Sequence, residues 1–517
     1  MNTTDFLSIA NAICPERDCI VFEGKRWTYA QINDRTNQLA IALSKKGVKN
    51  GDCIGVLHVN CNQYVETYFT AAKLGAIFVP LNFRAKADEL AYMIGHGEVK
   101  VLFVGDRYLD LVQSISPQLP KVKEVISIEG GTKPAYEDLI GSAPADEMSS
   151  EIGDEDITIL MYTSGTTGRP KGVPLRHNAF VTYVLENVEP ASPEIEERNL
   201  LTVPLYHVAG IQAMLAAIYG GRTLVLMRQF EVKEWMETIE RERATRAMLV
   251  PTMLKRVIDD SDFSKHDLSS LKVITYGAAP MPFEVIHKAI RVMPWARFIN
   301  AFGQTETAST ITTLGPDDHV IEGTDEEKAK KLKRLTSSIG RPLPDVEIKI
   351  VDEEGKALPH LEVGEILARG PRVMAGYWKD EEKTSQVMTP DGWLRTNDMG
   401  WMDEEGYIYL SGRADDMIIR GGENISPEEV EEVLHSHPKV EEAAIIGVPD
   451  VEWGQEPRAV VVLKKGESAT PEEMTEYCRS RLAGFKRPRS VIFIDALPRN
   501  PMGKVLRKKL RKEYGQP

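Results

Sequence analysis

The chain contains few cysteines, and its basic residues are outnumbered by acidic ones. Its 517 residues contain five cysteines, an odd number without any CxxC spacing. That scatter argues against a disulfide framework or a zinc site and indicates a reducing compartment. Lys and Arg number 63 against 77 Asp and Glu, which gives a net charge of −14. Nucleic acids are polyanions and bind positively charged surfaces. We therefore expect no nucleic-acid partner for so acidic a chain.

Long apolar runs are missing as well. The most apolar stretch, 210–227, is broken by Gly220, Gly221 and Arg222, whereas a membrane span needs about 20 apolar residues in succession. The N-terminus carries Asp5 and no basic stretch ahead of an apolar one, so no signal peptide is visible. We therefore expect a cytoplasmic protein without a transmembrane segment, present as a monomer or a homodimer.

The composition is that of a globular protein, with 42% hydrophobic and 27% charged residues. A chain of this length splits into roughly three folding units of about 150 residues. Helical and strand patterns alternate in the first third and again over 199–302, which predicts parallel sheets covered by helices. The segment 317–335 is highly charged and predicts a surface helix or a mobile excursion.

The chain changes character after this segment. Residues 339–410 are rich in Gly, Pro and short alternating strands, and they predict a small β-rich unit. A polar turn cluster near 412–416 separates it from a last unit of mixed strands and helices. The predicted fold class is α/β, with a large N-terminal domain of two α/β subdomains plus a small β-rich subdomain, and a small α+β C-terminal domain.

A loop rich in glycine and hydroxyl side chains stands out at 162–172, which has the sequence YTSGTTGRPKG. Glycines let backbone amides approach a ligand closely, hydroxyls add donors, and Lys171 adds a positive charge. Such a loop suits a polyphosphate. It is not a Walker A loop, because Lys171 follows Pro170 and precedes Gly172 instead of standing in GxxxxGK[ST].

Seven further motifs follow this loop in order. They are PLYHVAG at 204–210, YGAAP at 276–280, AFGQTE at 301–306, GRP at 340–342, the segment 393–398, GRADDMI at 412–418 and NPMGKVLRK at 500–508. With them the chain resembles, over nearly its whole length, the adenylate-forming enzymes: acyl- and aryl-CoA synthetases, firefly-type luciferases and peptide-synthetase adenylation domains. GGEN at 421–424 and the long C-terminal unit resemble the chlorobenzoate and medium-chain acyl-CoA ligase branch.

The resemblance implies a two-step ligase that uses ATP, Mg²⁺ and coenzyme A. A carboxylate attacks the α-phosphate of ATP to give an acyl-adenylate and pyrophosphate, and the thiol of CoA then displaces AMP. It also implies an adenylation domain at 1–412, a hinge at 413–416 centred on Asp415, and a C-terminal domain at 417–517 that rotates between the two steps.

Most family contacts to ATP have a counterpart here. Around the phosphates they are Thr163, Ser164, Gly165, Thr166, Thr167, Gly168 and Lys171. Around adenine they are Gly277, Ala278, Ala279, Asn300, Ala301, Phe302 and Gly303. Asp398 and Arg413 match the ribose contacts, although Arg413 could also be part of a plain salt bridge. The family usually has glycine where this chain has Asn397, and asparagine also tolerates a left-handed backbone.

Three residues match catalytic positions of the family. Glu306, paired with Thr305, would ligate Mg²⁺, since a hard carboxylate oxygen suits a hard cation. Lys504 would place its ammonium between the attacking carboxylate and the α-phosphate. On composition alone Lys504 heads a basic tail that could simply be solvated, formed by Arg507, Lys508, Lys509, Arg511 and Lys512. His207 would orient the carboxylate or gate its access, although a histidine on an apolar stretch is more often structural.

CoA positions carry over from the same branch of the family. Gly421 and Gly422 would line the tunnel for the pantetheine arm, where missing side chains leave room. The nucleotide end of CoA would meet aromatic faces and guanidinium groups. The matching residues there are Trp453, Phe485, Arg487 and Arg489, with surface packing as the alternative for Trp453.

The expected acyl pocket is small and apolar. Its candidates are His207, Val208, Ala209, Gly210, Met253, Ala308 and Ser309, together with Ala278, Ala279, Ala301 and Gly303. No Arg or Lys is among them, so a second carboxylate would be buried without a partner at a cost of several kcal/mol. The sequence therefore predicts an apolar monocarboxylate and leaves open whether it is aromatic, alicyclic or a medium-chain fatty acid.

Two alternatives remain for the activity. One is an adenylating enzyme with another acceptor, such as a carrier protein, or with luciferase-type oxygenation. The other is a non-catalytic protein of the same fold that binds nucleotide or acyl-CoA. The joint presence of Lys171, Glu306, Asp398, Arg413 and Lys504 argues against the second, because a binding-only relic need not keep them.

Overall fold

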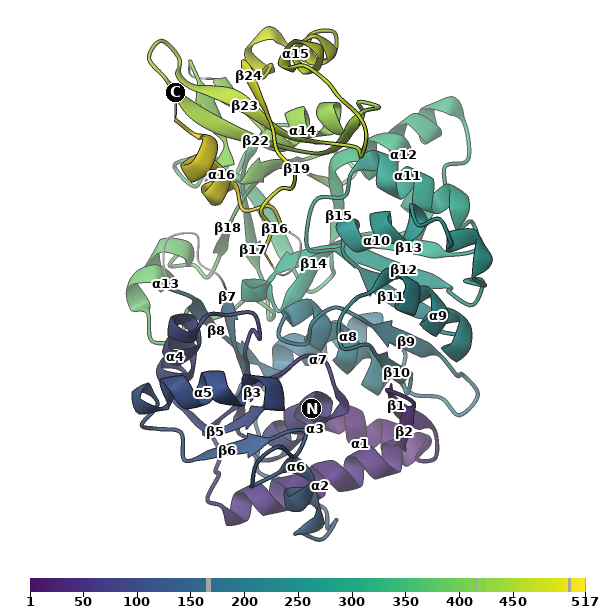
Figure 1. The fold of residues 1–517 in the computed structure, drawn as a ribbon, viewed down its shortest axis with the longest axis vertical. Coiled ribbons are helices and arrows are strands. Elements are labelled where there is room, and N and C mark those ends of the chain that lie inside the picture. Colours follow the sequence, from purple (N-terminus) through teal and green to yellow (C-terminus); the bar gives the residue numbers. More distant parts are fainter. Residues whose placement is uncertain (164–168, 414–415, 422, 501–503, 517) are drawn as a thin grey trace.

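The computed structural model of the chain describes residues 1–163, 169–413, 416–421, 423–500 and 504–516. Three sheets of six, thirteen and five strands organise it. In Figure 1 the first two sheets form the body of the molecule, and the third lies in the small C-terminal domain at the top of the view.

The six-stranded sheet has the order β6-β5-β3-β4-β7-β8. Its strands are β3 (Cys53–Leu57), β4 (Ile77–Pro80), β5 (Val99–Val104), β6 (Glu124–Ser127), β7 (Ile157–Thr163) and β8 (Lys171–Arg176). The first five pair in parallel, and β8 runs antiparallel to β7. Its helices are α2 (Tyr29–Lys45), α3 (Asn62–Lys73), α4 (Ala87–His96), α5 (Leu109–Ile115) and α6 (Tyr136–Gly141). All residues of β3 and β4 are buried, as is typical of parallel strands covered on both faces.

The thirteen-stranded sheet has a mainly parallel half. Its strands are β1 (Asp18–Phe22), β2 (Lys25–Thr28), β9 (Arg198–Leu201), β10 (Thr223–Leu226), β11 (Arg246–Leu249), β12 (Val273–Gly277) and β13 (Arg297–Gln304). Its helices are α1 (Thr4–Ile13), α7 (His177–Asn187), α8 (Val208–Tyr219), α9 (Val232–Glu242), α10 (Pro251–Ile258) and α11 (Phe283–Val292). The alternation over 199–302 therefore gives the predicted α/β arrangement.

The β-rich part extends this same sheet. Its strands are β14 (Ser309–Leu314), β15 (Ser338–Pro342), β16 (Glu347–Val351), β17 (Gly364–Arg369), β18 (Leu394–Met402) and β19 (Ile408–Arg413), all in antiparallel pairs. Two helices accompany them, α12 (Asp325–Ser337) and α13 (Glu381–Val387). Strand β14 pairs with β13, so the β-rich unit is joined edge to edge to the second α/β unit.

A shared core holds the two large sheets together. Buried residues of α1, α2, α3 and α8 form one apolar cluster with residues of β3 and β10. The other face of the first sheet packs on α4 and α5, and that of the second on α9, α10 and α11. Each sheet is thus covered on both sides, which fits its parallel strands.

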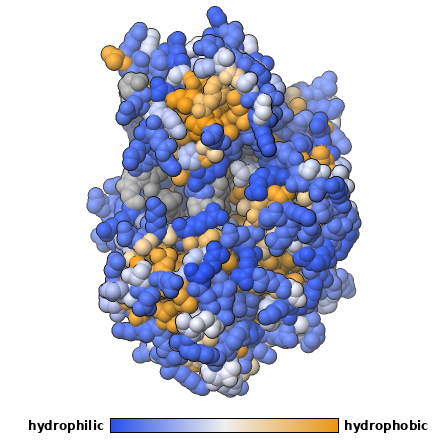
Figure 2. All heavy atoms as spheres, in the orientation of Figure 1, coloured by the Kyte–Doolittle hydropathy of each residue, from blue (hydrophilic) through white to orange (hydrophobic). Residues whose placement is uncertain are grey.

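The C-terminal sheet contains β20 (Ile418–Arg420), β21 (Glu423–Ile425), β22 (Val440–Asp450), β23 (Gly454–Leu463) and β24 (Ser490–Phe493). Helices α14 (Pro427–His435) and α15 (Pro471–Arg479) cover one face, and α16 (Arg507–Tyr514) covers the other. Figure 2 shows a largely hydrophilic face of the molecule with apolar patches, one of them over this domain. Among the described residues, no helix is long and apolar enough to cross a membrane.

Candidate active site

Asp398 and Arg413 face each other on the neighbouring antiparallel strands β18 and β19. The Arg413 Nε lies 2.8 Å from the Asp398 Oδ1, and Asp398 is buried. Burial raises the pKa of Asp398, and the cations of Arg413 and Lys504 oppose that rise. Asn397 has a φ of 61°, so asparagine forms the left-handed turn ahead of the aspartate.

Lys504, in the C-terminal domain, lies near enough to this pair for their charges to influence one another. Its backbone N–H donates to the side-chain oxygen of Asn500 at 2.9 Å, and its carbonyl accepts from the Asn500 N–H at 2.8 Å. Burial and the cation of Arg413 lower the pKa of Lys504, while Asp398 raises it. The charges of Lys504 and Asp398 are therefore close enough to influence each other across the two domains.

Glu306 lies in a short 3₁₀ turn, Thr305–Thr307, directly after β13. Its Oε1 accepts a hydrogen bond from the Tyr377 hydroxyl at 2.9 Å, and its carbonyl accepts from the Met374 N–H at 2.8 Å. Burial and the charge of Glu306 raise the pKa of Tyr377 well above its usual value. The Lys171 ammonium lies 4.8 Å from the Tyr377 ring centre. Tyr377 thus brings Glu306 and Lys171 to one place.

The turn around Glu306 leaves little room for larger side chains. A Cβ on Gly303 would lie 1.6 Å from the Ser309 carbonyl oxygen, and one on Gly277 would lie 2.1 Å from that of Ala301. Ala308 and Ser309 have φ of 49° and 87°, a region that non-glycine residues seldom adopt. Such local strain often accompanies a functional site, because the surrounding packing must hold it in place.

The remaining adenine candidates lie along the same strands. Ala278 follows β12 with a φ of 67° and is exposed, as expected of a residue at an open site, and Ala279 comes next. The Asn300 amide donates to the Ser338 carbonyl at 3.4 Å. Phe302 is partly buried against apolar residues of the antiparallel strands, so one of its faces is already packed.

His207 stands at the N-cap of α8 with a buried, unsatisfied nitrogen. Its Nε2 is buried, and none of the described residues hydrogen-bonds it. Burial lowers the pKa of His207 to about 3, so the ring is neutral near pH 7. An orphaned buried nitrogen at a helix start fits a ligand group, because such an atom otherwise costs about 1–3 kcal/mol.

The acyl-pocket candidates divide between two core clusters. Val208 and Ala308 belong to the cluster between the two large sheets, whereas Met253 packs against the cluster on the far face of the second sheet. Ala209 and Ser309 are half-buried. Gly210 is buried where a Cβ would lie 2.5 Å from the Pro204 carbonyl oxygen.

Seven candidates lie outside the described residues. They are Ser164, Gly165, Thr166, Thr167, Gly168, Asp415 and Gly422. The flanks of the glycine-rich loop are described: β7 ends at Thr163 and β8 begins at Lys171, and these two residues are paired in register.

Comparison with known proteins identifies the family. Residues 9–378 match the AMP-binding enzyme family, and residues 429–504 match the AMP-binding enzyme C-terminal domain. This chain belongs to the AMP-binding enzymes. Their fold, a large α/β body with a small C-terminal domain, is the predicted one, and the prediction is confirmed.

Relatives of this AMP-binding enzyme match it over nearly their whole length. The putative acyl-CoA synthetase YngI of Bacillus subtilis (strain 168) is 33% identical over 96% of this chain and 94% of its own. The fatty acid–[acyl-carrier-protein] ligase ScoC of Streptomyces coeruleorubidus is 32% identical, covering 97% and 94%. The solved structure of the anthranilate CoA ligase AuaEII with anthranoyl-AMP has a TM-score of 0.90 at 29% identity, covering 99% and 97%.

The CoA candidates of this AMP-binding enzyme occupy two parts of the C-terminal domain. The Gly421 N–H donates to the Trp453 carbonyl at 2.8 Å, and a Cβ on Gly421 would lie 2.7 Å from the Trp453 ring. Arg420, which the motifs did not single out, lies 4.9 Å from the centre of that ring. Phe485, Arg487 and Arg489 lie together along 484–490, ahead of β24. The Arg487 Nε donates to the Leu482 carbonyl at 3.0 Å.

Arg372 is a buried charge that the sequence analysis missed. It donates to the carbonyl of Thr310, next to the pocket candidate Ser309. Its Nε lies 2.6 Å from Asp345, so its charge is balanced by a carboxylate. On the other side, the Gln212 side chain accepts from the Thr310 N–H at 3.2 Å. No spacing in the sequence links 212, 310, 345 and 372, and only the fold brings them together.

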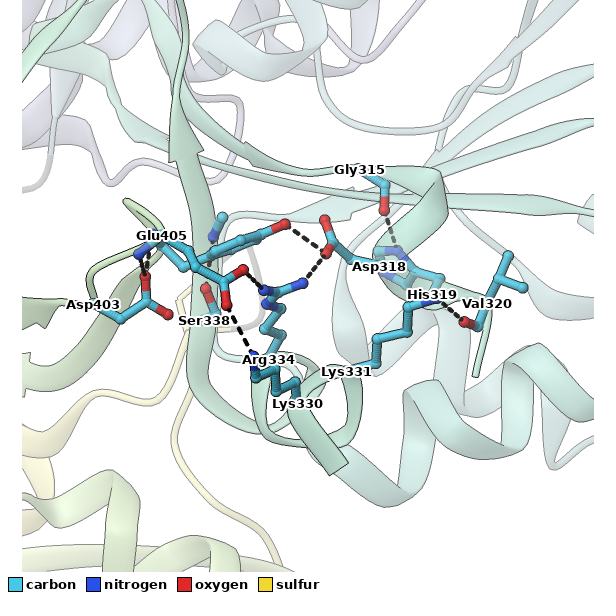
Figure 3. A network of polar contacts seen from close by, with 12 residues as sticks. Gly315, Asp318, His319, Val320, Lys330, Lys331, Arg334, Ser338, Asp403 and Glu405 are labelled. Carbon is cyan, nitrogen blue, oxygen red and sulfur yellow. Dashed lines mark hydrogen bonds and ion pairs between the residues drawn. The ribbon is translucent and has the colours of Figure 1, made fainter. Parts of the chain in front are cut away.

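A second polar network contacts β12, the strand that ends at the adenine candidate Gly277, and Figure 3 shows part of this network. His319 Nδ1 lies 2.7 Å from the Gly315 carbonyl and therefore carries the proton, so Nε2 accepts from the Tyr276 hydroxyl at 2.9 Å. Arg334 of α12 pairs with Asp318 at 3.0 Å and with Glu405 at 2.5 Å. Within the charged segment 317–335, helix α12 is thus fastened to the turn at Asp318 and to the connection between β18 and β19 at Glu405.

Proposed function

We propose that this chain is an ATP-dependent carboxylate–CoA ligase that forms an acyl-adenylate and then an acyl-CoA. The observation that carries the proposal is the buried Asp398–Arg413 ion pair of the body, which lies near enough to Lys504 of the C-terminal domain for their charges to act on one another. This arrangement occurs in a chain whose relatives include acyl-CoA synthetases and the anthranilate CoA ligase AuaEII.

In the first step, the nucleotide would be held by residues at strand ends. Asp398, kept in place by Arg413, accepts hydrogen bonds from the ribose hydroxyls. Gly277, Ala278 and Ala279 pass beside the adenine, where the missing or small side chains leave room. Lys504 faces two anions that must approach each other, the carboxylate and the α-phosphate, and its ammonium offsets their repulsion.

Mg²⁺ fits the residues around Glu306. Magnesium is usually held by one or two carboxylates together with substrate phosphates, and here Glu306 is held in place by Tyr377. The ion would supply charge neutralisation at the phosphates. Lys171 and the 164–168 loop would hold the phosphates from the side of β7 and β8.

The acyl group is an apolar monocarboxylate in this proposal. The pocket candidates are small or apolar, and one nearby cation, Arg372, is already paired with Asp345. A second carboxylate on the substrate would therefore find no free partner in Arg372; the exposed Arg84, whose charge acts on His207, is another cation near these candidates. The neutral His207 ring presents Nε2 to the carboxylate that reacts.

In the second step, the C-terminal domain would turn about the 413–416 hinge. Gly421 and Gly422 would then line the pantetheine tunnel, while Trp453, Phe485, Arg487 and Arg489 would bind the nucleotide end of CoA. We place the reaction in the cytoplasm, where CoA and ATP are available and where the five buried free cysteines stay reduced.

A carrier protein is the competing acceptor, because ScoC is an acyl-carrier-protein ligase. A panel of aromatic, alicyclic and medium-chain monocarboxylates with ATP and Mg²⁺ separates the two. Each acid is offered with CoA or with holo acyl carrier protein, and AMP and thioester are both quantified. Thioester formation with CoA supports the proposal. Thioester formation with the carrier protein alone, or no AMP with any acid, contradicts it.

A further inference from the structure

We propose that an ion pair between Lys255 and Glu441 positions the C-terminal domain so that Lys504 reaches the Asp398–Arg413 pair. Lys255 belongs to α10 in the body of the molecule, and Glu441 belongs to β22 in the C-terminal domain. The Lys255 Nζ and the Glu441 Oε1 lie 2.5 Å apart. The inference rests on the proposed role of Lys504, because it concerns how that residue is delivered.

A β-bulge sets the direction of Glu441. Between β22 and β23, Val440 pairs with Leu463 and Glu442 pairs with Val462, so Glu441 is an extra residue in its strand. A bulge of this kind bends the strand and redirects a side chain out of the regular alternation. Here the redirected carboxylate leaves the C-terminal domain and meets α10.

Glu442, the next residue, connects the same strand to the segment that carries Lys504. It accepts a hydrogen bond from Arg499 at 2.7 Å. Arg499 in turn forms a backbone bridge with Val505, which directly follows Lys504. Two successive carboxylates therefore link α10 on one side to the Lys504 segment on the other. A shift of β22 relative to α10 moves Lys504 as well.

Because of the charges around it, the Lys255–Glu441 ion pair should contribute more to the domain arrangement than an isolated surface ion pair would. The two domains enclose a crevice of about 400 Å³ here, lined by the carboxylates of Glu231, Asp259, Asp260, Glu441 and Glu442 and by the cations of Lys255 and Arg256. Lys255 also lies 3.1 Å from Asp259. Without the Lys255 charge, carboxylates of the two domains would face each other and repel.

The test measures the two half-reactions separately for Lys255→Glu, Glu441→Lys and the double variant with both changes. Adenylate formation is followed as pyrophosphate release, and thiolation as thioester formation from supplied acyl-adenylate and CoA. In Lys255→Glu, adenylate formation should slow about 3- to 10-fold, since exposed ion pairs are individually weak and reversal adds repulsion. Thiolation should not slow. The double variant should return to within about 2-fold of the wild-type adenylation rate.

Lys288→Glu is the matched control. The Lys288 Nζ lies 2.5 Å from Asp259, the same carboxylate that Lys255 contacts, but both of these residues belong to the body. Equal slowing in Lys288→Glu, equal slowing of both half-reactions in Lys255→Glu, or no recovery in the double variant would each overturn the positioning role. A normal adenylation rate in Lys504→Ala would overturn the role of Lys504 together with this inference. A slow Lys504→Ala beside an unaffected Lys255→Glu would overturn the ion pair alone.

Discussion

The charged side chains at the candidate site influence one another's pKa values. Asp398 pairs with Arg413 and is acted on by the charge of Lys504, while burial raises the pKa of Asp398 and lowers that of Lys504. Each group thus depends on its partners to keep the ionised form, because burial alone favours the neutral one. At the other end of the site, Tyr377 donates to Glu306. Removal of one partner should therefore change the charge state of the groups that remain.

Lys504→Ala should slow adenylate formation by about 10²-fold or more, because the charge that offsets two approaching anions is lost. Thioester formation from supplied acyl-adenylate should stay within about 3-fold, since that step does not need this cation. Single-turnover kinetics of both steps provide the measurement. Lys509→Ala, which removes an exposed cation of the basic tail, is the control and should leave both steps unchanged. Equal loss in both steps would contradict the assignment.

Tyr377→Phe should raise the Mg²⁺ concentration needed for half-maximal adenylation about 3- to 10-fold. The phenyl ring still packs beside Lys171, but Glu306 loses the hydroxyl that orients its carboxylate. Outer-shell hydrogen bonds of this kind commonly change metal affinity by about 10- to 100-fold, and the loss of a single such bond should give the lower end. Magnesium titrations of pyrophosphate release check this. An unchanged magnesium requirement would separate Glu306 from the metal.

The element that matters most for the site is the β13–β14 hairpin with the Glu306 turn. Gly303 packs its backbone against Ser309, and the turn between them holds Ala308 and Ser309 at positive φ. The strands on both sides, paired from Asn300 to Leu314, supply the contacts that keep this conformation. A strained turn persists only where its surroundings over-determine it.

Gly303→Ala should destabilise the protein by about 2–3 kcal/mol, because the new methyl group meets the Ser309 carbonyl and the hairpin must open. The matched control is Gly95→Ala in α4, where a Cβ meets nothing within 4 Å. That change should be neutral or slightly stabilising, since alanine favours a helix. Thermal unfolding of the two variants gives the comparison. Similar midpoints would show that the hairpin adapts to the methyl group.

At the scale of the whole molecule, burial of several histidines links stability to pH. Burial lowers the pKa of His177 and of His319 to about 4. The His177 Nδ1 accepts from the Thr3 N–H at 3.3 Å, so a proton on that nitrogen would break the contact. His319 uses both ring nitrogens, one with the Tyr276 hydroxyl of β12 and the other with the Gly315 carbonyl. Both rings are neutral in the folded state near pH 7.

The free energy of unfolding should therefore fall as the pH drops from about 6.5 toward about 4. In this window the unfolded chain binds protons that the folded chain does not, so stability rises with pH. Each histidine should account for about 2 kcal/mol between pH 7 and pH 5. Melting curves across this range check it. In His177→Asn the free energy of unfolding should change less steeply with pH. In His360→Gln, which alters an exposed ring, its dependence on pH should stay the same. The same pH dependence in both variants would contradict the expectation.

The sequence by itself determined the family, the α/β class and the order of the functional segments. Those features follow from local patterns: strand and helix periods, a glycine-rich loop, and short motifs whose chemistry needs particular residues. Of the two forms predicted for the charged segment 317–335, a surface helix or a mobile excursion, the part from Asp325 onward takes the first, as α12. The hinge at 413–416 and the roles of the site residues stay predictions.

Only the tertiary structure decided which side chains meet. It placed Tyr377 on Glu306, Asp345 against Arg372, and Lys255 against Glu441. It also joined the β-rich strands to the second α/β sheet through β13 and β14. In each pair the partners lie far apart along the chain, so no local sequence pattern contains both of them. Their contact depends on how the sheets and domains pack. That packing results from many interactions between distant residues, so no short segment of sequence determines it.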